Sequence, residues 1–82
     1  MKKPTIDVKI LAAPGAALHE TAKRVWASVE RARCPIAVEQ VQDPRQIALF
    51  GAPATPALIV DGLLVSTGVV PTASAIQHWL RP

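Results

Sequence analysis

The feature that most limits the fold is a pair of apolar runs joined by Asp61-Gly62. Residues 57–60 read Ala-Leu-Ile-Val and residues 63–67 read Leu-Leu-Val-Ser-Thr. The two residues between them are of the kind that makes a tight turn between antiparallel strands. Both runs are short and rich in β-branched or bulky apolar side chains, so the pattern predicts a β-hairpin.

The chain before the hairpin predicts a strand and a helix. Residues 5–11 alternate polar and apolar side chains, which is typical of a strand with one covered face. After a break at Pro14-Gly15, apolar residues recur at helical steps of four and three, namely at Leu18, Ala22, Val25, Val29 and Ala32. We expect this helix to end around Arg33, because Pro35 disfavours helical geometry in the residue before it.

A second strand and a short helix follow. Residues 36–41, Ile-Ala-Val-Glu-Gln-Val, predict a second strand. Asp43 can then act as an N-cap, with Pro44 at the first helical position and Gln46 at the capping-box position. Gly51 can end this short helix.

The final segment predicts a third helix. Thr72 is a suitable N-cap for a helix over residues 73–80. Helical spacing places Ile76, Trp79 and Leu80 inward, and we interpret Trp26 likewise as a partly buried packing residue.

The order of these elements predicts one α/β domain over residues 1–82. Strands separated by a helix favour a parallel pair with a crossover, and the hairpin adds an antiparallel edge. The sequence therefore predicts a β-α-β-α-β-β-α fold with a central four-stranded mixed sheet and helices on both faces. A chain of 82 residues, half of them apolar, suits one small core rather than two domains.

Composition argues against several classes of function. The nine Lys and Arg residues give a net charge of +3 but are scattered, and the chain has only two Trp, one Phe and no Tyr. A nucleic-acid surface would need concentrated basic charge, with aromatic residues to stack on single strands, so we expect no nucleic-acid partner.

Membrane, export and metal signals are also missing from the sequence. No stretch approaches the roughly 18 apolar residues of a membrane span, so we expect no membrane insertion. Asp7 and Lys9 interrupt the apolar region that a signal peptide would need, which favours a cytoplasmic location. His19 and His78 have no further ligand at metal-binding spacing, so we expect neither metal nor cofactor.

The segment at residues 54–72, ATPALIVDGLLVSTGVVPT, resembles the small bacterial and archaeal members of the thioredoxin-like family, and the element order agrees over nearly the whole chain. The shared features are the Thr-Pro pair, the hairpin turn, a glycine after the hairpin and the final cap. The resemblance implies a thioredoxin fold in which Pro56 follows a cis peptide bond and Thr55 borders a substrate groove. From the residues alone, a trans proline that merely starts a strand remains open.

The second hallmark of that family, a C-x-x-C pair at the start of the first helix, is absent. An ungapped alignment places its two cysteines at Gly15 and Leu18, neither of which carries a thiol. Cys34 is the single cysteine, and it lies 16 residues beyond Leu18. At about 1.5 Å per helical residue this is on the order of 20 Å away, well beyond the reach of a disulfide. Internal dithiol chemistry is therefore excluded.

Two functional hypotheses follow. In the first, the chain is a redox-inactive module that binds a protein, a peptide or a small anion at the degenerate turn and the proline loop, that is at Pro14, Gly15, Ala16, Ala17, Leu18, Thr55 and Pro56. In this case it is not an enzyme. The turn could equally have lost its cysteines in a chain whose role lies elsewhere.

The second hypothesis is enzymatic and rests on Cys34. A single thiol can form a mixed disulfide with glutathione or a partner protein, and Arg31 and Arg33 lie near it in sequence. Against this, a cysteine after the end of a helix meets the unfavourable pole of the helix dipole. Lone cysteines also serve as packing residues.

Overall fold

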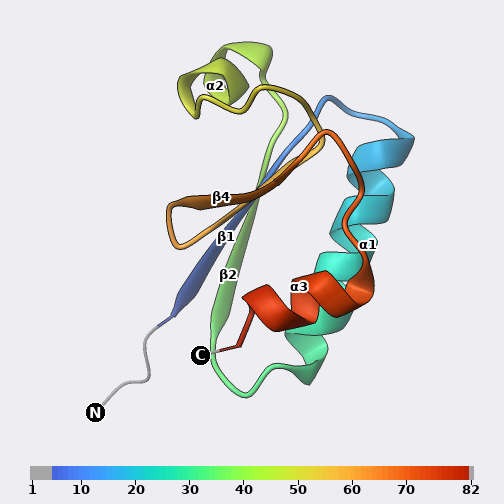
Figure 1. Ribbon diagram of the computed structural model, residues 1–82, viewed down its shortest axis with the longest axis vertical. Helices are drawn as coiled ribbons and strands as arrows, with labels where there is room; N and C mark the ends of the chain where they lie inside the picture. The colour runs from blue at the N-terminus through green and yellow to red at the C-terminus, as the bar shows by residue number, and fades with distance from the viewer. Residues whose placement is uncertain (1–4, 82) are drawn as a thin grey trace.

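The protein is described by a computed structural model that covers residues 5–81 (Figure 1). Within these residues the elements follow the predicted order: β1 (Ile6–Leu11), α1 (Ala16–Arg31), β2 (Ile36–Val41), α2 (Pro44–Leu49), β3 (Ala57–Val60), β4 (Leu63–Thr67) and α3 (Ala73–Trp79). The predicted α/β architecture is confirmed.

The four strands form one mixed sheet in the order β2-β1-β3-β4. β1 runs parallel to β2 and antiparallel to β3, and β3 pairs antiparallel with β4 through the predicted hairpin. Figure 1 shows α1 and α3 packed beside one another, with α2 at the far end of the molecule from α3. α1 and α3 pack against one core of the sheet and α2 against another, so α1 and α3 lie on one face and α2 on the other.

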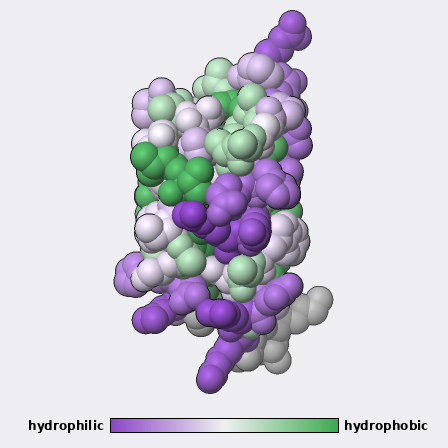
Figure 2. Space-filling view, turned by 90° about the vertical axis from the view of Figure 1, so that its right-hand side faces the viewer, coloured by the Kyte–Doolittle hydropathy of each residue, from purple (hydrophilic) through white to green (hydrophobic). Residues whose placement is uncertain are grey.

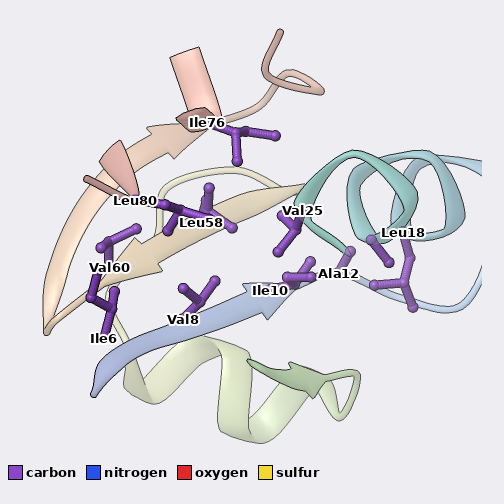
Figure 3. Packing of buried hydrophobic residues seen from close by; sticks show 11 residues of the cluster. Ile6, Val8, Ile10, Ala12, Leu18, Val25, Leu58, Val60, Ile76 and Leu80 are labelled. Carbon is purple, nitrogen blue, oxygen red and sulfur yellow. The ribbon is translucent and has the colours of Figure 1, made fainter. Parts of the chain in front are cut away.

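The larger core lies between the sheet and the pair α1 and α3 (Figure 3). Alternate residues of β1 point into it, because successive strand side chains face opposite sides, and Val8 and Ile10 are fully buried. α1 contributes Val25, and α3 contributes Ile76, which is also fully buried. The cluster consists of Ile6, Val8, Ile10, Ala12, Leu18, Ala22, Val25, Leu58, Val60, Ile76 and Leu80.

The opposite face has a smaller core at one end. Leu11, Val41, Ala57 and Ile59 form it, and Ile47 of α2 packs against them. α2 begins as predicted, with the Asp43 side chain accepting a hydrogen bond from the Arg45 N–H at 2.9 Å. Beside this core an open hollow of about 320 Å³ is lined by Glu39, Val41, Gln46, Leu49 and Phe50.

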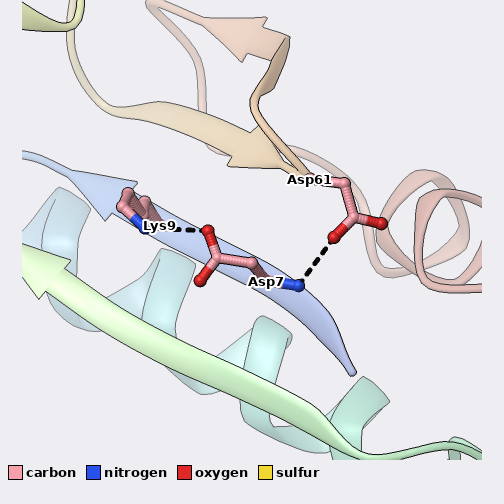
Figure 4. A network of polar contacts seen from close by, with 3 residues as sticks. All are labelled: Asp7, Lys9 and Asp61. Atoms are coloured by element: carbon pink, nitrogen blue, oxygen red, sulfur yellow. Dashed lines mark hydrogen bonds and ion pairs between the residues drawn. The ribbon is translucent and has the colours of Figure 1, made fainter. Parts of the chain in front are cut away.

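The hairpin turn is tied back to the first strand (Figure 4). Asp61 and Gly62 both have positive φ, 50° and 81°, as a two-residue hairpin of this type requires. The Asp61 side chain accepts a hydrogen bond from the Asp7 N–H, and the Asp61 N–H donates to the Asp7 carbonyl, both at 2.8 Å. Lys9 donates to the Asp7 carboxylate at 2.7 Å, and this hydrogen bond raises the pKa of Lys9.

Two expectations from the sequence need correction. α1 ends at Arg31 rather than around Arg33, because Ala32 is already extended, with φ −73° and ψ 148°. Trp79 packs against the larger core as expected, but Trp26 belongs to neither cluster and is 47% exposed. The inward stripe of α1 instead uses two small polar residues, Thr21 and Ser28. No apolar pattern could mark them.

We predict that Ile76→Ala lowers the free energy of unfolding by about 2 to 5 kcal/mol, because it opens a cavity where α3 meets the sheet. Gln77→Ala, on the exposed side of the same helix, should change it by no more than about 0.5 kcal/mol. Urea unfolding followed by tryptophan fluorescence measures both. Equal effects of the two variants would show that α3 is not held by this core.

Candidate functional site

Three segments meet at the end of the sheet where β1 stops and β3 starts. Leu11 pairs with Ala57, so the loop after β1 and the residues before β3 lie at the same end. The Gly68 N–H donates to the Pro56 carbonyl at 2.9 Å, which brings the end of the hairpin to the same place. We call residues 14–18, 54–56 and 68–69 the loop cluster.

The turn that enters α1 presents mostly backbone to solvent. Pro14, Gly15, Ala16 and Ala17 are exposed, and Gly15 is an N-cap without a side-chain hydrogen bond. The first helical bond is donated by the His19 N–H to the Gly15 carbonyl at 3.0 Å. The N–H groups of residues 16–18 therefore have no acceptor within residues 5–81, and they carry the positive end of the helix dipole.

Leu18 differs from its neighbours in this turn. It is 6% exposed and belongs to the larger core. Its side chain therefore packs beneath the turn, and little of the residue is accessible to a ligand.

Gly15 has a backbone conformation that other residues avoid. Its φ of 154° with ψ of −170° lies in the region populated almost only by glycine. A Cβ at this position would meet no atom within 4 Å. Backbone conformation therefore favours glycine at this position, and steric crowding does not.

The proline loop exposes a single unpaired peptide position. The Thr55–Pro56 bond is cis, and Thr55 is exposed while Pro56 is buried. The Ala54 backbone is occupied, since its N–H donates to Thr67 Oγ1 at 3.2 Å and its carbonyl accepts from the same hydroxyl at 2.7 Å. Among residues 5–81, neither the N–H nor the carbonyl of Thr55 has a hydrogen-bond partner.

The sequence interpretation did not include Thr67, Gly68 and Val69 among the candidate site residues. The Thr67 hydroxyl forms two hydrogen bonds with the Ala54 backbone. A Cβ on Gly68 would approach Ala54 Cβ to 3.3 Å, so the segment after β4 packs closely against the segment before β3. Val69 is 62% exposed beside them. The glycine at position 68, which the 54–72 segment shares with the family motif, was the available signal, but hydrogen bonds between loops have no sequence pattern.

Cys34 lies away from the loop cluster. It follows the carboxyl end of α1, a helix of 16 residues, which spans about 24 Å. Its side chain is half-buried and packs against the larger core. The structure therefore does not bring the thiol to the turn or to Thr55.

Comparison with known proteins places these observations in a family. A family model described as a thioredoxin domain matches residues 6–81. The chain belongs to this thioredoxin domain family. The match covers the whole sheet and the three helices of the described residues. A search of curated proteins gives no match.

Two further searches of the described residues bear on function. Within residues 5–81 there is no helix long and apolar enough to cross a membrane. In the same part of this thioredoxin domain, no three His, Cys, Asp or Glu side chains are grouped so that they could hold a metal ion.

We predict that Gly15→Ala destabilises the protein by about 1 to 3 kcal/mol, because alanine must adopt a conformation reserved for glycine. Ala17→Ser adds one atom to the same exposed turn without that strain, and it should cost no more than about 0.5 kcal/mol. Thermal unfolding of the two variants gives the comparison. If Gly15→Ala is as stable as the parent protein, the backbone at residue 15 can adopt another conformation without a cost in stability.

Proposed function

We propose that this thioredoxin domain is a redox-inactive module that binds an extended segment of a partner protein at the loop cluster. The observation that carries the proposal is the unpaired backbone N–H and carbonyl of exposed Thr55, next to an exposed helix start without large side chains. An extended peptide that pairs with an unsatisfied backbone N–H and carbonyl gains affinity from main-chain hydrogen bonds.

Dithiol exchange is excluded by the composition of the chain. The reaction requires one thiolate to attack a substrate disulfide and a second thiol to release the mixed disulfide. Cys34 is the single cysteine, and it lies at the other end of α1. The loop cluster can thus bind a segment without transferring electrons to it.

The turn at α1 supplies a second type of contact. Three N–H groups at residues 16–18 lack acceptors in the described part of the chain, and a helix start favours negative charge. A carboxylate of the partner, from an acidic side chain or a chain terminus, fits this position. The same N–H groups could also bind a small free anion instead of a carboxylate of the partner.

Val69 adds an apolar contact beside Thr55. It is 62% exposed although it belongs to the loop that closes on Pro56. Burying such a side chain against an apolar residue of the partner contributes about 1.5 to 3 kcal/mol. Backbone pairing, an anion contact and an apolar contact together define a peptide-binding surface.

We predict that peptides selected from a random display library bind at this surface. On titration of ¹⁵N-labelled protein, the amide signals of Gly15, Ala16, Thr55 and Val69 should shift together. Val69→Asp should weaken binding at least about tenfold through lost apolar contact and a new charge. The matched control is Leu63→Asp in the hairpin, because Leu63 is 67% exposed but lies outside the loop cluster.

Two results would contradict this proposal. In the first, the selected peptides shift only protein amide signals outside the loop cluster. In the second, Val69→Asp and Leu63→Asp weaken peptide binding equally, which would indicate non-specific binding to exposed apolar residues rather than a defined site.

We also predict that the protein does not accelerate insulin reduction by dithiothreitol above the uncatalysed rate. The reason is that no second thiol is present to resolve a mixed disulfide. Cys34→Ser should leave the measured rate unchanged. A rate that rises with protein concentration and disappears in Cys34→Ser would instead assign a single-thiol activity to Cys34.

A further inference from the structure

We propose that Arg24 is a positioning residue of the loop cluster that also sets its preference for acidic segments. It fixes the segment that carries Val69 against α1, and it offsets the charge of Glu20 beside the proposed anion contact. The inference rests on the proposed function, because it concerns the same peptide-binding surface. Arg24 is not part of the loop cluster, so it acts on a bound segment through the residues that it holds.

The guanidinium of Arg24 joins two parts of the chain. Its Nη1 donates a hydrogen bond at 2.9 Å to the carbonyl of Pro71, which lies 47 positions away in the sequence. Its Nε donates to Glu20 Oε1 at 3.1 Å. The side chains of Arg24 and Glu20 are 37% and 42% exposed, so the bridge is partly shielded from water. Charge-assisted hydrogen bonds in such a setting are stronger than fully exposed ion pairs.

The segment between β4 and α3 is attached near both of its ends, and Val69 lies between the two attachments. The Gly68 N–H donates to the Pro56 carbonyl at 2.9 Å, which joins one end to the proline loop. Arg24 joins the other end, at Pro71, to α1. In Figure 1 this segment, drawn in orange to red, runs beside α1 before α3 begins. Without Arg24, Val69 is held from one side only, and its ordering on binding then costs additional conformational entropy.

Arg24 also controls the charge next to the exposed turn. Glu20 follows Ala16 by four positions, so it lies on the same side of α1, and helical side chains tilt toward the start of the helix. An unpaired carboxylate there would repel a carboxylate of the partner from the free N–H groups of residues 16–18. The guanidinium of Arg24 pairs with Glu20 and offsets its charge. The bridge therefore favours an acidic segment over a neutral one.

The neighbouring residue on α1 provides a matched control. Lys23 carries the same charge as Arg24, but it is exposed and has no hydrogen bond or ion pair with residues 5–81. Figure 2, which shows the side of the molecule where α1 lies, shows strongly hydrophilic residues in the middle of this face with hydrophobic residues next to them. A variant of Lys23 therefore reports the effect of net charge alone, without loss of the bridge.

The test uses ¹⁵N-labelled protein and the peptides selected by display, each compared with an analogue that carries amides in place of its carboxylates. We expect the parent protein to bind the acidic form more tightly. Arg24→Ala should weaken binding of the acidic form at least about fivefold and abolish the preference for it, because Glu20 is then unpaired. Lys23→Ala should change either affinity less than about twofold.

Variants of Glu20 separate the two roles of Arg24. Glu20→Gln removes the carboxylate but leaves the hydrogen bond to Pro71, so the acidic peptide should bind at least as tightly as to the parent. Glu20→Gln combined with Arg24→Ala should restore the preference for the acidic form, but not the affinity lost through the loosened Val69 segment. In Arg24→Ala without peptide, amide signals of residues 20–24 and 68–72 should shift. Unchanged signals of the sheet show that the variant is folded.

Four results would overturn the inference alone. They are equal effects of Arg24→Ala and Lys23→Ala, a preference for the acidic form that survives Arg24→Ala, weaker binding of that form to Glu20→Gln, and selected peptides without carboxylates. Each of these is compatible with peptide binding at the loop cluster. Selected peptides that shift only amide signals outside the loop cluster would instead refute the proposed function, and this inference with it.

Discussion

The structure depends on the double pairing of β1. This strand lies inside the sheet, with β2 parallel on one side and β3 antiparallel on the other. Its alternate side chains enter the two cores on opposite faces, so Ile10 belongs to one core and Leu11 to the other. The end of β1 also fixes where the turn before α1 stands relative to Thr55. Sheet, core and candidate site are therefore positioned by one segment of six residues.

Much of this arrangement follows from local patterns. Asp61-Gly62 predicts the hairpin because a two-residue turn needs positive φ at both positions, which these residues tolerate. Asp43 and Thr72 predict helix starts because a short polar side chain can accept a backbone N–H, and both do so in the structure. The order of the strands in the sheet, β2-β1-β3-β4, was not predicted, because local periodicity leaves it undetermined.

The features that sequence reasoning missed all depend on tertiary contact. Thr21 is fully buried, and its hydroxyl has no hydrogen-bond partner among residues 5–81, which no helical pattern would anticipate. The bridge from Thr67 to Ala54 joins positions 13 residues apart. Arg31 and Arg81 are 50 positions apart in the sequence, and they line one cavity only because α1 and α3 end near one another. The arginines there are exposed, in agreement with the predicted solvated surface, although the fold brings them to one hollow.

The proposed binding surface draws on the start of α1, where the free N–H groups attract an anion without any charged side chain, so small residues suffice there. Backbone groups also supply the proposed contact at Thr55, whose N–H and carbonyl have no partner among residues 5–81. Cys34 is the single cysteine, and it lies at the other end of α1. Binding at this surface, as proposed, therefore relies on backbone groups rather than on thiols.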